Sequence, residues 1–418
     1  MTNSVSNRIK RGTPFYFYTF LMLMWSSRTS GYWDLYSATG IMTIVYLFVN
    51  YFFYQKYCQK SDHKQLYQFI SLILIWYFIS CIKYGTMLHL PYSIIYDGII
   101  VFIAYQMMQE RFFHYFDQVL ADISLICLIV WLGAVLFPTF VPNLVHKISI
   151  TPVGGLPMDC NFFVFGLSGQ YELGIRRNLG FTWEPGRYSC FLLLGLIVNL
   201  TINKFRIGGN KNFWILFISL FSTFSTTGYV SSAIVLLYYA MNRHVATKTW
   251  VLLIFSIILP TIIALPFMRE KMTTYVLELS FDQAISEVLY RSKFESQIVP
   301  QRGFGAMMDF YNAKNDPLLG YAVFENSYCY TTLMKGIRVI SSNGFLNIFA
   351  QFGIFVALYF YGLLILSSIR FGKIWNVKCS WLFAVLFFMI SVSYDFWGGI
   401  ALYFVLFALY DKRSLVKT

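Results

Sequence analysis

The stretch RRNLGFTWEPGRYS, from Arg176 to Ser189, ends a long polar loop and begins an apolar helix. Proline is tolerated in the first turn of a helix, where its missing N–H has no partner in any case, so Pro185 marks the helix start. Glu184 precedes it, and a carboxylate is favoured at the positive end of the helix dipole. The apolar run that follows predicts that this helix enters a membrane.

Cations and aromatic residues surround this helix start. Arg176 and Arg177 lie just upstream, at the expected membrane edge. We expect aromatic surface beside them from Phe181, Trp183 and Tyr188. Cations, a carboxylate and aromatic surface at one interface predict a site for an anionic, lipid-linked molecule.

Composition sets the fold class. The chain has 418 residues, of which 57% are hydrophobic and only 12% charged. A soluble domain of this size needs more polar surface, so we expect an all-α polytopic membrane protein. In a membrane protein, the net charge of +13 reflects how Lys and Arg are distributed between the two sides of the lipid bilayer, and it does not indicate binding of nucleic acid. The first apolar run begins at Pro14 with no small-residue cleavage site after it, so no cleaved signal is expected.

The apolar runs predict about twelve membrane helices, with both termini on one side. They are expected at residues 14–27, 33–54, 66–84, 92–109, 119–138, 186–203, 212–225, 228–242, 249–267, 344–367, 379–392 and 394–411. With the N-terminus in the cytoplasm, 18 of the 32 Lys and Arg residues fall in cytoplasmic segments. The short loops of the opposite side hold only Arg28 and Lys83, which is the asymmetry that the positive-inside rule describes.

This map divides the chain into five parts. Residues 1–138 hold the N-terminal membrane helices, 186–267 a central set and 344–418 the C-terminal set. Residues 139–186 and 268–343 are two long extracytoplasmic loops, and the second is expected to be helical around 272–294 and 304–311. The basic residues of these loops have no topological explanation, so we expect a phosphate-bearing partner.

The sequence gives little support for a metal site or for catalysis by cysteine. The five histidines and seven cysteines show no metal-ligand spacing, and neither a metal nor another cofactor is expected. Cys160 and Cys329 are the cysteines well inside the external loops; a disulfide between them and two free thiols both remain open.

The stretch around Glu184 resembles the Arg-x-x-Gly-Phe-x-x-Glu-Pro-Gly signature of Wzy-type polysaccharide polymerases, in the O-antigen polymerase and ligase superfamily. The residues on that signature are Arg177, Gly180, Phe181, Glu184, Pro185 and Gly186. Three later stretches, at 225–237, 301–321 and 342–359, resemble further family segments in the same order.

The resemblance implies a GT-C-like glycosyltransferase of polysaccharide and lipopolysaccharide biosynthesis. It would act at the periplasmic face of the bacterial inner membrane on undecaprenyl-diphosphate-linked oligosaccharides, with a chain-length regulator protein as a candidate partner. Arg302, Arg177, Arg176 and Arg291 are the expected diphosphate-binding residues. Trp183, Tyr188 and Asn343 are the candidates for binding sugar.

The general base remains open. Glu184 is a candidate, either as a base or as a residue that orients an arginine. Asp97, expected inside a membrane helix and paired with Lys83 or Arg28, is a second candidate, and Asp395 is a third.

Two other functions compete with polymerisation. O-antigen ligases typically carry His-Asn where the second loop re-enters the membrane, whereas this chain has Ser342-Asn343. A lipid-linked oligosaccharide flippase would be expected to show internal symmetry and interrupted helices, which the sequence does not show clearly. The sugars, the linkage and its stereochemistry, the type of glycan and the oligomeric state do not follow from the sequence.

Overall fold

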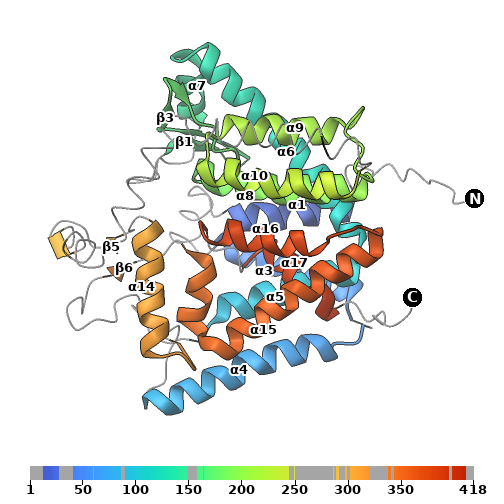
Figure 1. The fold of residues 1–418 in the computed structure, drawn as a ribbon, viewed down its shortest axis with the longest axis vertical. Helices are drawn as coiled ribbons and strands as arrows, with labels where there is room; N and C mark the ends of the chain where they lie inside the picture. The colour runs from blue at the N-terminus through green and yellow to red at the C-terminus, as the bar shows by residue number, and fades with distance from the viewer. Residues whose placement is uncertain are drawn as a thin grey trace, which may run out of the picture. The chain divides into compact units, whose positions relative to one another are not determined.

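The computed structural model of the chain is mostly helical (Figure 1). It describes residues 13–27, 41–59, 61–85, 90–148, 158–162, 164–243, 249, 286, 289–290, 297–298, 302–320, 338–339, 343–394 and 398–410. Two compact units are formed, each from two pieces of chain. Unit 1 combines Met1–Ser61 with Phe102–Val235, and unit 2 combines Asp62–Val101 with Leu236–Thr418.

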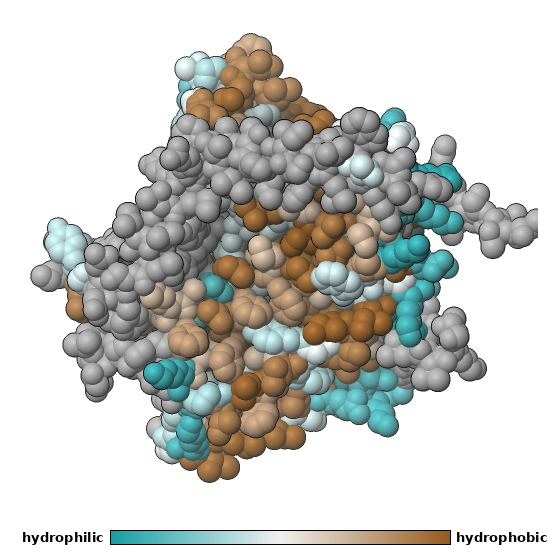
Figure 2. All heavy atoms as spheres, viewed as in Figure 1, coloured by the Kyte–Doolittle hydropathy of each residue, from teal (hydrophilic) through white to brown (hydrophobic). Residues whose placement is uncertain are grey.

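Four described helices are long and apolar enough to cross a membrane. They are α4 (Lys64–Tyr84), α6 (Arg111–Leu136), α8 (Pro185–Ile202) and α15 (Gly344–Trp375). Shorter apolar helices accompany them, namely α5 (Tyr92–Met108), α9 (Lys211–Ser222), α16 (Trp381–Ser391) and α17 (Ala401–Tyr410). Much of the described surface visible in Figure 2 is apolar, which fits a chain surrounded by lipid.

Most predicted helices are present close to their predicted ends. Helix α1 (Pro14–Ser27) has the predicted bounds, and α4, α5, α8 and α10 (Thr226–Met241) differ from theirs by one or two residues. The second predicted helix is seen as α3 (Ile41–Tyr57), since residues 28–40 lie outside the described part. Of the predicted helix at 249–267, residues 250–267 also lie outside it.

Helices α6 and α15 differ most from prediction. Helix α6 begins at Arg111, eight residues before the predicted start at 119, because a polar first turn continues the helix beyond the apolar run. Helix α15 reaches Trp375 and is interrupted at Gly353, where the backbone is not helical.

The first long loop contains regular structure that the sequence did not predict. Helix α7 (Phe140–Ile148) is followed by the antiparallel pair β1 (Met158–Phe162) and β2 (Phe165–Ser168) and by a second pair, β3 (Tyr171–Glu172) and β4 (Ile175–Arg176). Ala134, Val145 and Leu167 form a small buried cluster that fixes α7 and β2 on the end of α6. The loop is thereby attached to a membrane helix.

Helix α8 is the core of unit 1. Every side chain from Pro185 to Thr201 is buried. It packs with α6 and α9. Gly195 permits this close approach, because a Cβ there would come within 2.5 Å of a methyl carbon of Leu120.

A buried polar network joins the same three helices near their other ends. Asp117 of α6 accepts hydrogen bonds from the amides of Asn199 (2.8 Å) and Asn212 (2.9 Å). Asn210 donates to Asn199 (2.8 Å), and its own side-chain oxygen caps α9. Hydrogen bonds to a charged group contribute about 1.5–3 kcal/mol each, so this network fixes the register of α6, α8 and α9.

Unit 2 is organised around α15, which packs against α4, α14 (Arg302–Asn315), α16 and α17. The break at Gly353 is filled by the turn that follows α14. Ile354 N–H donates to the carbonyl of Pro317 (2.8 Å), and a Cβ at Gly353 would collide with the backbone of Leu318. Trp76 and Tyr84 of α4 donate to the carbonyls of Leu319 (2.9 Å) and Gly320 (3.1 Å). The 315–320 turn is thus held between α4 and α15.

A short parallel pair, β5 (Gln297–Ile298) with β6 (Arg338–Val339), lies in the same unit.

Candidate functional site

The loop before α8 is a tight structure built by Asn178 and Gly180. The side-chain oxygen of Asn178 accepts from Gly180 N–H (2.9 Å), and its amide donates to Ser222 Oγ (2.8 Å). Gly180 has a φ of +61°, and a Cβ there would lie 2.6 Å from the ring of Tyr188. Both the left-handed backbone and the ring require glycine at this position of the motif.

Glu184 is the N-cap residue of α8, with an extended backbone, and Pro185 follows as the first helical residue. The Glu184 carboxylate accepts no capping hydrogen bond. Thr182 Oγ1 instead donates to the Glu184 carbonyl (2.8 Å) and orders the approach to the helix. The Glu184 side chain therefore does not cap α8.

Two short motifs meet where α8 faces α10. Ser189 Oγ donates to the Gly186 carbonyl (2.7 Å) and bonds Ser225 Oγ (3.1 Å). A Cβ at Gly228 would lie 2.9 Å from the Cβ of Ser189. The start of the stretch at 225–237 therefore contacts the stretch around Glu184 within unit 1. Small residues at helix crossings are the signal from which this contact was predictable.

Arg177 lies at the centre of this structure and is half-buried. Its Nε donates to the carbonyl of Thr223 (3.0 Å), and an Nη donates to Gln170 Oε1 (2.7 Å). Its backbone N–H also donates to the Gln170 carbonyl (3.0 Å). These bonds fix the guanidinium between the β2–β3 turn and the α9–α10 turn.

Arg176 has a different environment from its neighbour. Its side chain is buried, and its guanidinium donates to the Ser168 carbonyl (2.7 Å) and to Tyr171 Oη (2.5 Å). The guanidinium also stacks on the Tyr171 ring, 4.9 Å from its centroid. Its own carbonyl accepts from Trp131 Nε1 (2.6 Å). Arg176 thus holds the β3–β4 hairpin on α6.

The expected aromatic surface is wrong for two of its three members. Phe181 and Tyr188 are both fully buried, with their rings 5.5 Å apart in an edge-on contact. Phe191 extends the cluster at 5.4 Å from Phe181. Their apolar rings fill the space beneath the Gly180 turn, so Tyr188 offers no surface to a sugar. Trp183 is half-buried and remains the accessible aromatic residue of this loop.

Asp97 lies in unit 2 and is buried on α5. Its Oδ2 accepts from Gly399 N–H (2.8 Å), just before α17 begins, and a Cβ at Gly398 would approach the same oxygen. Lys83, expected as a partner for Asp97, is instead paired with Asp316 at 2.6 Å. The carboxylate of Asp97 therefore has a structural function in holding the start of α17.

Asn343 caps α15 and is buried. Its side-chain oxygen accepts from Leu346 N–H (3.0 Å). One and two helical turns further on, Asn347 and Gln351 follow on the same face, and the Gln351 amide donates to Asn347 Oδ1 (3.0 Å). The sequence patterns did not single out this line of amides in the first part of α15. The i, i+4, i+8 spacing of the three residues was the available signal.

Several predicted residues are described in part or lie outside the described ranges. Arg302 is the first residue of α14, but its side chain is not described. The same holds for the side chain of Cys160 in β1. Arg291, Asp395, Cys329 and Arg28 lie outside the described residues. Arg176, Arg177, Trp183, Glu184 and Tyr188 belong to unit 1, and Asp97, Arg302 and Asn343 to unit 2.

Within the described ranges, no group of three or more His, Cys, Asp or Glu residues is arranged to hold a metal ion. Comparison with protein-family models, with curated proteins and with solved structures finds no match for this chain.

Proposed function

We propose that this chain is a GT-C-like glycosyltransferase with about twelve membrane spans. It polymerises undecaprenyl-diphosphate-linked oligosaccharides at the outer face of the bacterial cytoplasmic membrane. The observation that carries the proposal is the structure of the loop before α8. Gly180 occupies a position that admits only glycine, and Pro185 is the first helical residue, a position that suits proline. The same loop presents Arg177, Trp183 and Glu184 with part of each side chain accessible.

The reaction needs charge stabilisation where the diphosphate leaves. A hydroxyl oxygen of the incoming repeat unit forms a bond to the anomeric carbon of the growing chain. The bond from that carbon to the diphosphate oxygen breaks, and the hydroxyl proton passes to a base, for which Glu184 is the candidate in this loop. Negative charge grows on the diphosphate, and one preorganised donor is worth about 2.7–4 kcal/mol in such a step.

The arginines divide according to their surroundings. Arg177 is the donor in unit 1, because hydrogen bonds to Thr223 and Gln170 orient its guanidinium and part of the side chain is accessible. Arg176 contributes by orienting the hairpin, since its guanidinium already binds Ser168 and Tyr171. Arg302 is proposed as the main donor of unit 2, at the first residue of α14, where the helix dipole also favours an anion. Arg291 is proposed as a lesser contributor.

Reconstitution tests this proposal. The purified chain in proteoliposomes is given a synthetic undecaprenyl-diphosphate oligosaccharide, and products are separated by mass. A ladder of repeat units supports polymerisation, whereas intact substrate, at full protein incorporation, contradicts it. Arg302→Lys keeps the charge but loses the bidentate fork, so it should remain impaired in this assay. Arg206→Ala, an exposed arginine of the α8–α9 loop, is the matched control and should extend glycan normally.

In cells, Arg302→Ala should leave protein levels normal and cap lipid A-core with a single repeat unit. This phenotype also separates polymerase from ligase, because loss of a ligase leaves no repeat unit on the core. Full-length glycan from well-expressed Arg302→Ala and Arg177→Ala variants would contradict the assigned donors.

One observation favours the flippase alternative. Helix α15 is interrupted at Gly353, and broken membrane helices are typical of transporters. In this chain, backbone of the 315–320 turn fills the break, so fewer of the exposed backbone groups at the break can bind a substrate. A flippase would move the lipid-linked substrate across the liposome membrane with no new glycosidic bond, so the same assay separates the two functions.

A further inference from the structure

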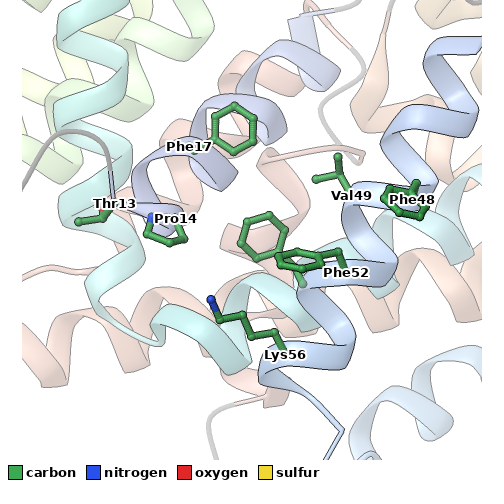
Figure 3. Close-up of a pocket in the computed structure, with 8 residues that line it drawn as sticks. Thr13, Pro14, Phe17, Phe48, Val49, Phe52 and Lys56 are labelled. Carbon is green, nitrogen blue, oxygen red and sulfur yellow. The ribbon is translucent and has the colours of Figure 1, made fainter.

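A groove of about 480 Å³ lies between α1 and α3 in unit 1 (Figure 3). Its walls are apolar side chains of both helices, chiefly Phe17, Phe48, Val49 and Phe52. Thr13 and Lys56 stand at one end, where α1 begins and α3 ends. In the predicted topology this end faces the cytoplasm, so the groove is distinct from the site before α8.

The floor of the groove is fixed by contacts between the two helices. Tyr18 donates to Asn50 Oδ1 (2.5 Å), and its ring lies 4.8 Å from that of Phe53. Phe53 is 5% exposed, whereas Phe48 and Phe52 are 70% and 54% exposed. The groove is therefore a stable, preformed concavity with bulky apolar sides.

The mouth of the groove is positively charged. Lys56 is exposed, and its ammonium lies 5.4 Å from the centroid of the Tyr57 ring and points into the gap between the helices in Figure 3. Within the described ranges it has no carboxylate at ion-pair distance. The sequence adds Arg8, Lys10, Arg11 and Lys60 nearby in the chain, while residues 1–33 and 35–61 contain no Asp or Glu. Asp34 and Asp62 are the acidic residues of 1–62, so this part of the sequence carries a surplus of cations that favours an anionic partner.

We propose that this groove binds an acyl chain of an anionic phospholipid of the cytoplasmic leaflet, with Lys56 paired to its phosphate. Basic pockets between membrane helices on the cytoplasmic side recognise such headgroups. A flexible acyl chain suits the groove better than a second helix does. Contacts between membrane helices are enriched in small residues, whereas these walls carry phenylalanine.

Lipid binding to the purified full-length chain tests this directly. Native mass spectrometry in detergent would measure the affinities for dioleoyl-phosphatidylglycerol and for dioleoyl-phosphatidylcholine. One lysine near an anionic surface corresponds to about a fivefold preference for the anionic lipid. Lys56→Gln should abolish this preference. Lys64→Gln, the same charge change at the exposed start of α4, should preserve it.

A second variant tests the acyl chain separately from the headgroup. Val49→Trp places a large ring in the groove, so it should weaken binding of both lipids while leaving thermal stability near that of the wild type. The proposal fails if Lys56→Gln and Lys64→Gln behave alike. It also fails if Val49→Trp binds both lipids as the wild type does, or if the wild type shows dimers that Val49→Trp removes, since a second copy would then occupy the groove.

Discussion

Lys83 Nζ lies 2.6 Å from Oδ2 of Asp316, so an ion pair joins the last turn of α4 to the turn that follows α14. The carboxylate side chain is 5% exposed and the ammonium side chain 43%. The other carboxylate oxygen accepts from Leu319 N–H (3.4 Å), within the turn that fills the break in α15. The pair therefore fixes a segment of the second long loop on two membrane helices of unit 2.

Loss of this ion pair should destabilise the protein. Lys83→Met leaves the buried Asp316 carboxylate without its cation, and we expect a cost of about 1–3 kcal/mol. Thermal unfolding in detergent measures it. Lys64→Met, at the exposed first residue of the same helix, should change the midpoint little. Equal effects of the two variants would show that the pair contributes nothing.

The break in α15 should tolerate no side chain at its glycines. Gly353 (φ +75°) and Gly320 (φ +64°) each face the backbone of the other's segment, and a Cβ at either would collide with it. Gly353→Ala and Gly320→Ala should each cost more than about 3 kcal/mol, measured by the yield of monodisperse protein and its melting temperature. Gly362→Ala, in the same helix with open space around it, is the control and should be near neutral. A well-folded Gly353→Ala protein would contradict the described break.

Substitution of Arg177 should affect mainly glycan extension, whereas substitution of Arg176 should affect mainly the melting temperature. Arg177→Lys should reduce glycan extension by about 10²-fold or more, with little change in melting temperature, because it removes an oriented donor. Arg176→Lys should lower the melting temperature, because it removes bonds to Ser168 and Tyr171 and the stacking on the Tyr171 ring. Extension assays and thermal unfolding on both proteins check this. The reverse pattern would exchange the two roles.

The membrane topology can be tested by cysteine labelling at two exposed positions, Lys314 and Gly208. Lys314→Cys, near the end of α14, should react with an impermeant maleimide on intact spheroplasts. Gly208→Cys, in the α8–α9 loop with open space around it, should react only after permeabilisation. Both are made in a background lacking the native cysteines. Labelling of Gly208→Cys alone on intact cells would overturn the topology.

Helix positions in this chain were predictable where the apolar run itself sets the boundary. The run from Pro14 to Ser27 begins at a proline, which fixes the helix start, and α1 has those bounds. The predicted start of α6 lies eight residues too late, because its first turns carry Arg111, His114 and Asp117, and such a polar pattern is typical of a loop. Asp117 is stabilised inside the protein by Asn199 and Asn212, partners that are 82 and 95 residues away. No local pattern reveals such partners.

In the candidate site too, local features were predictable from the sequence, whereas contacts between distant residues were not. Pro185 was predictable from a local backbone constraint, and Gly180 was identified by its place in the signature that the stretch resembles. The burial of Tyr188 beneath Gly180 and the use of Arg176 within a hairpin depend on the path of the loop. An aromatic residue in the first turn of a membrane helix is equally compatible with the interface and with the core.

The interruption at Gly353 has a consequence for how the protein matches its bilayer. An unbroken helix of 32 residues would be roughly 48 Å long, against a hydrocarbon thickness of about 30 Å. The segment from Ile354 to Trp375 alone is roughly 33 Å long, which fits that thickness with slight tilt. Hydrophobic mismatch therefore acts on this longer segment. The shorter segment, from Gly344 to Phe352, takes its position from protein contacts, so a thicker or thinner membrane should change the tilt of one part of α15 and leave the other in place.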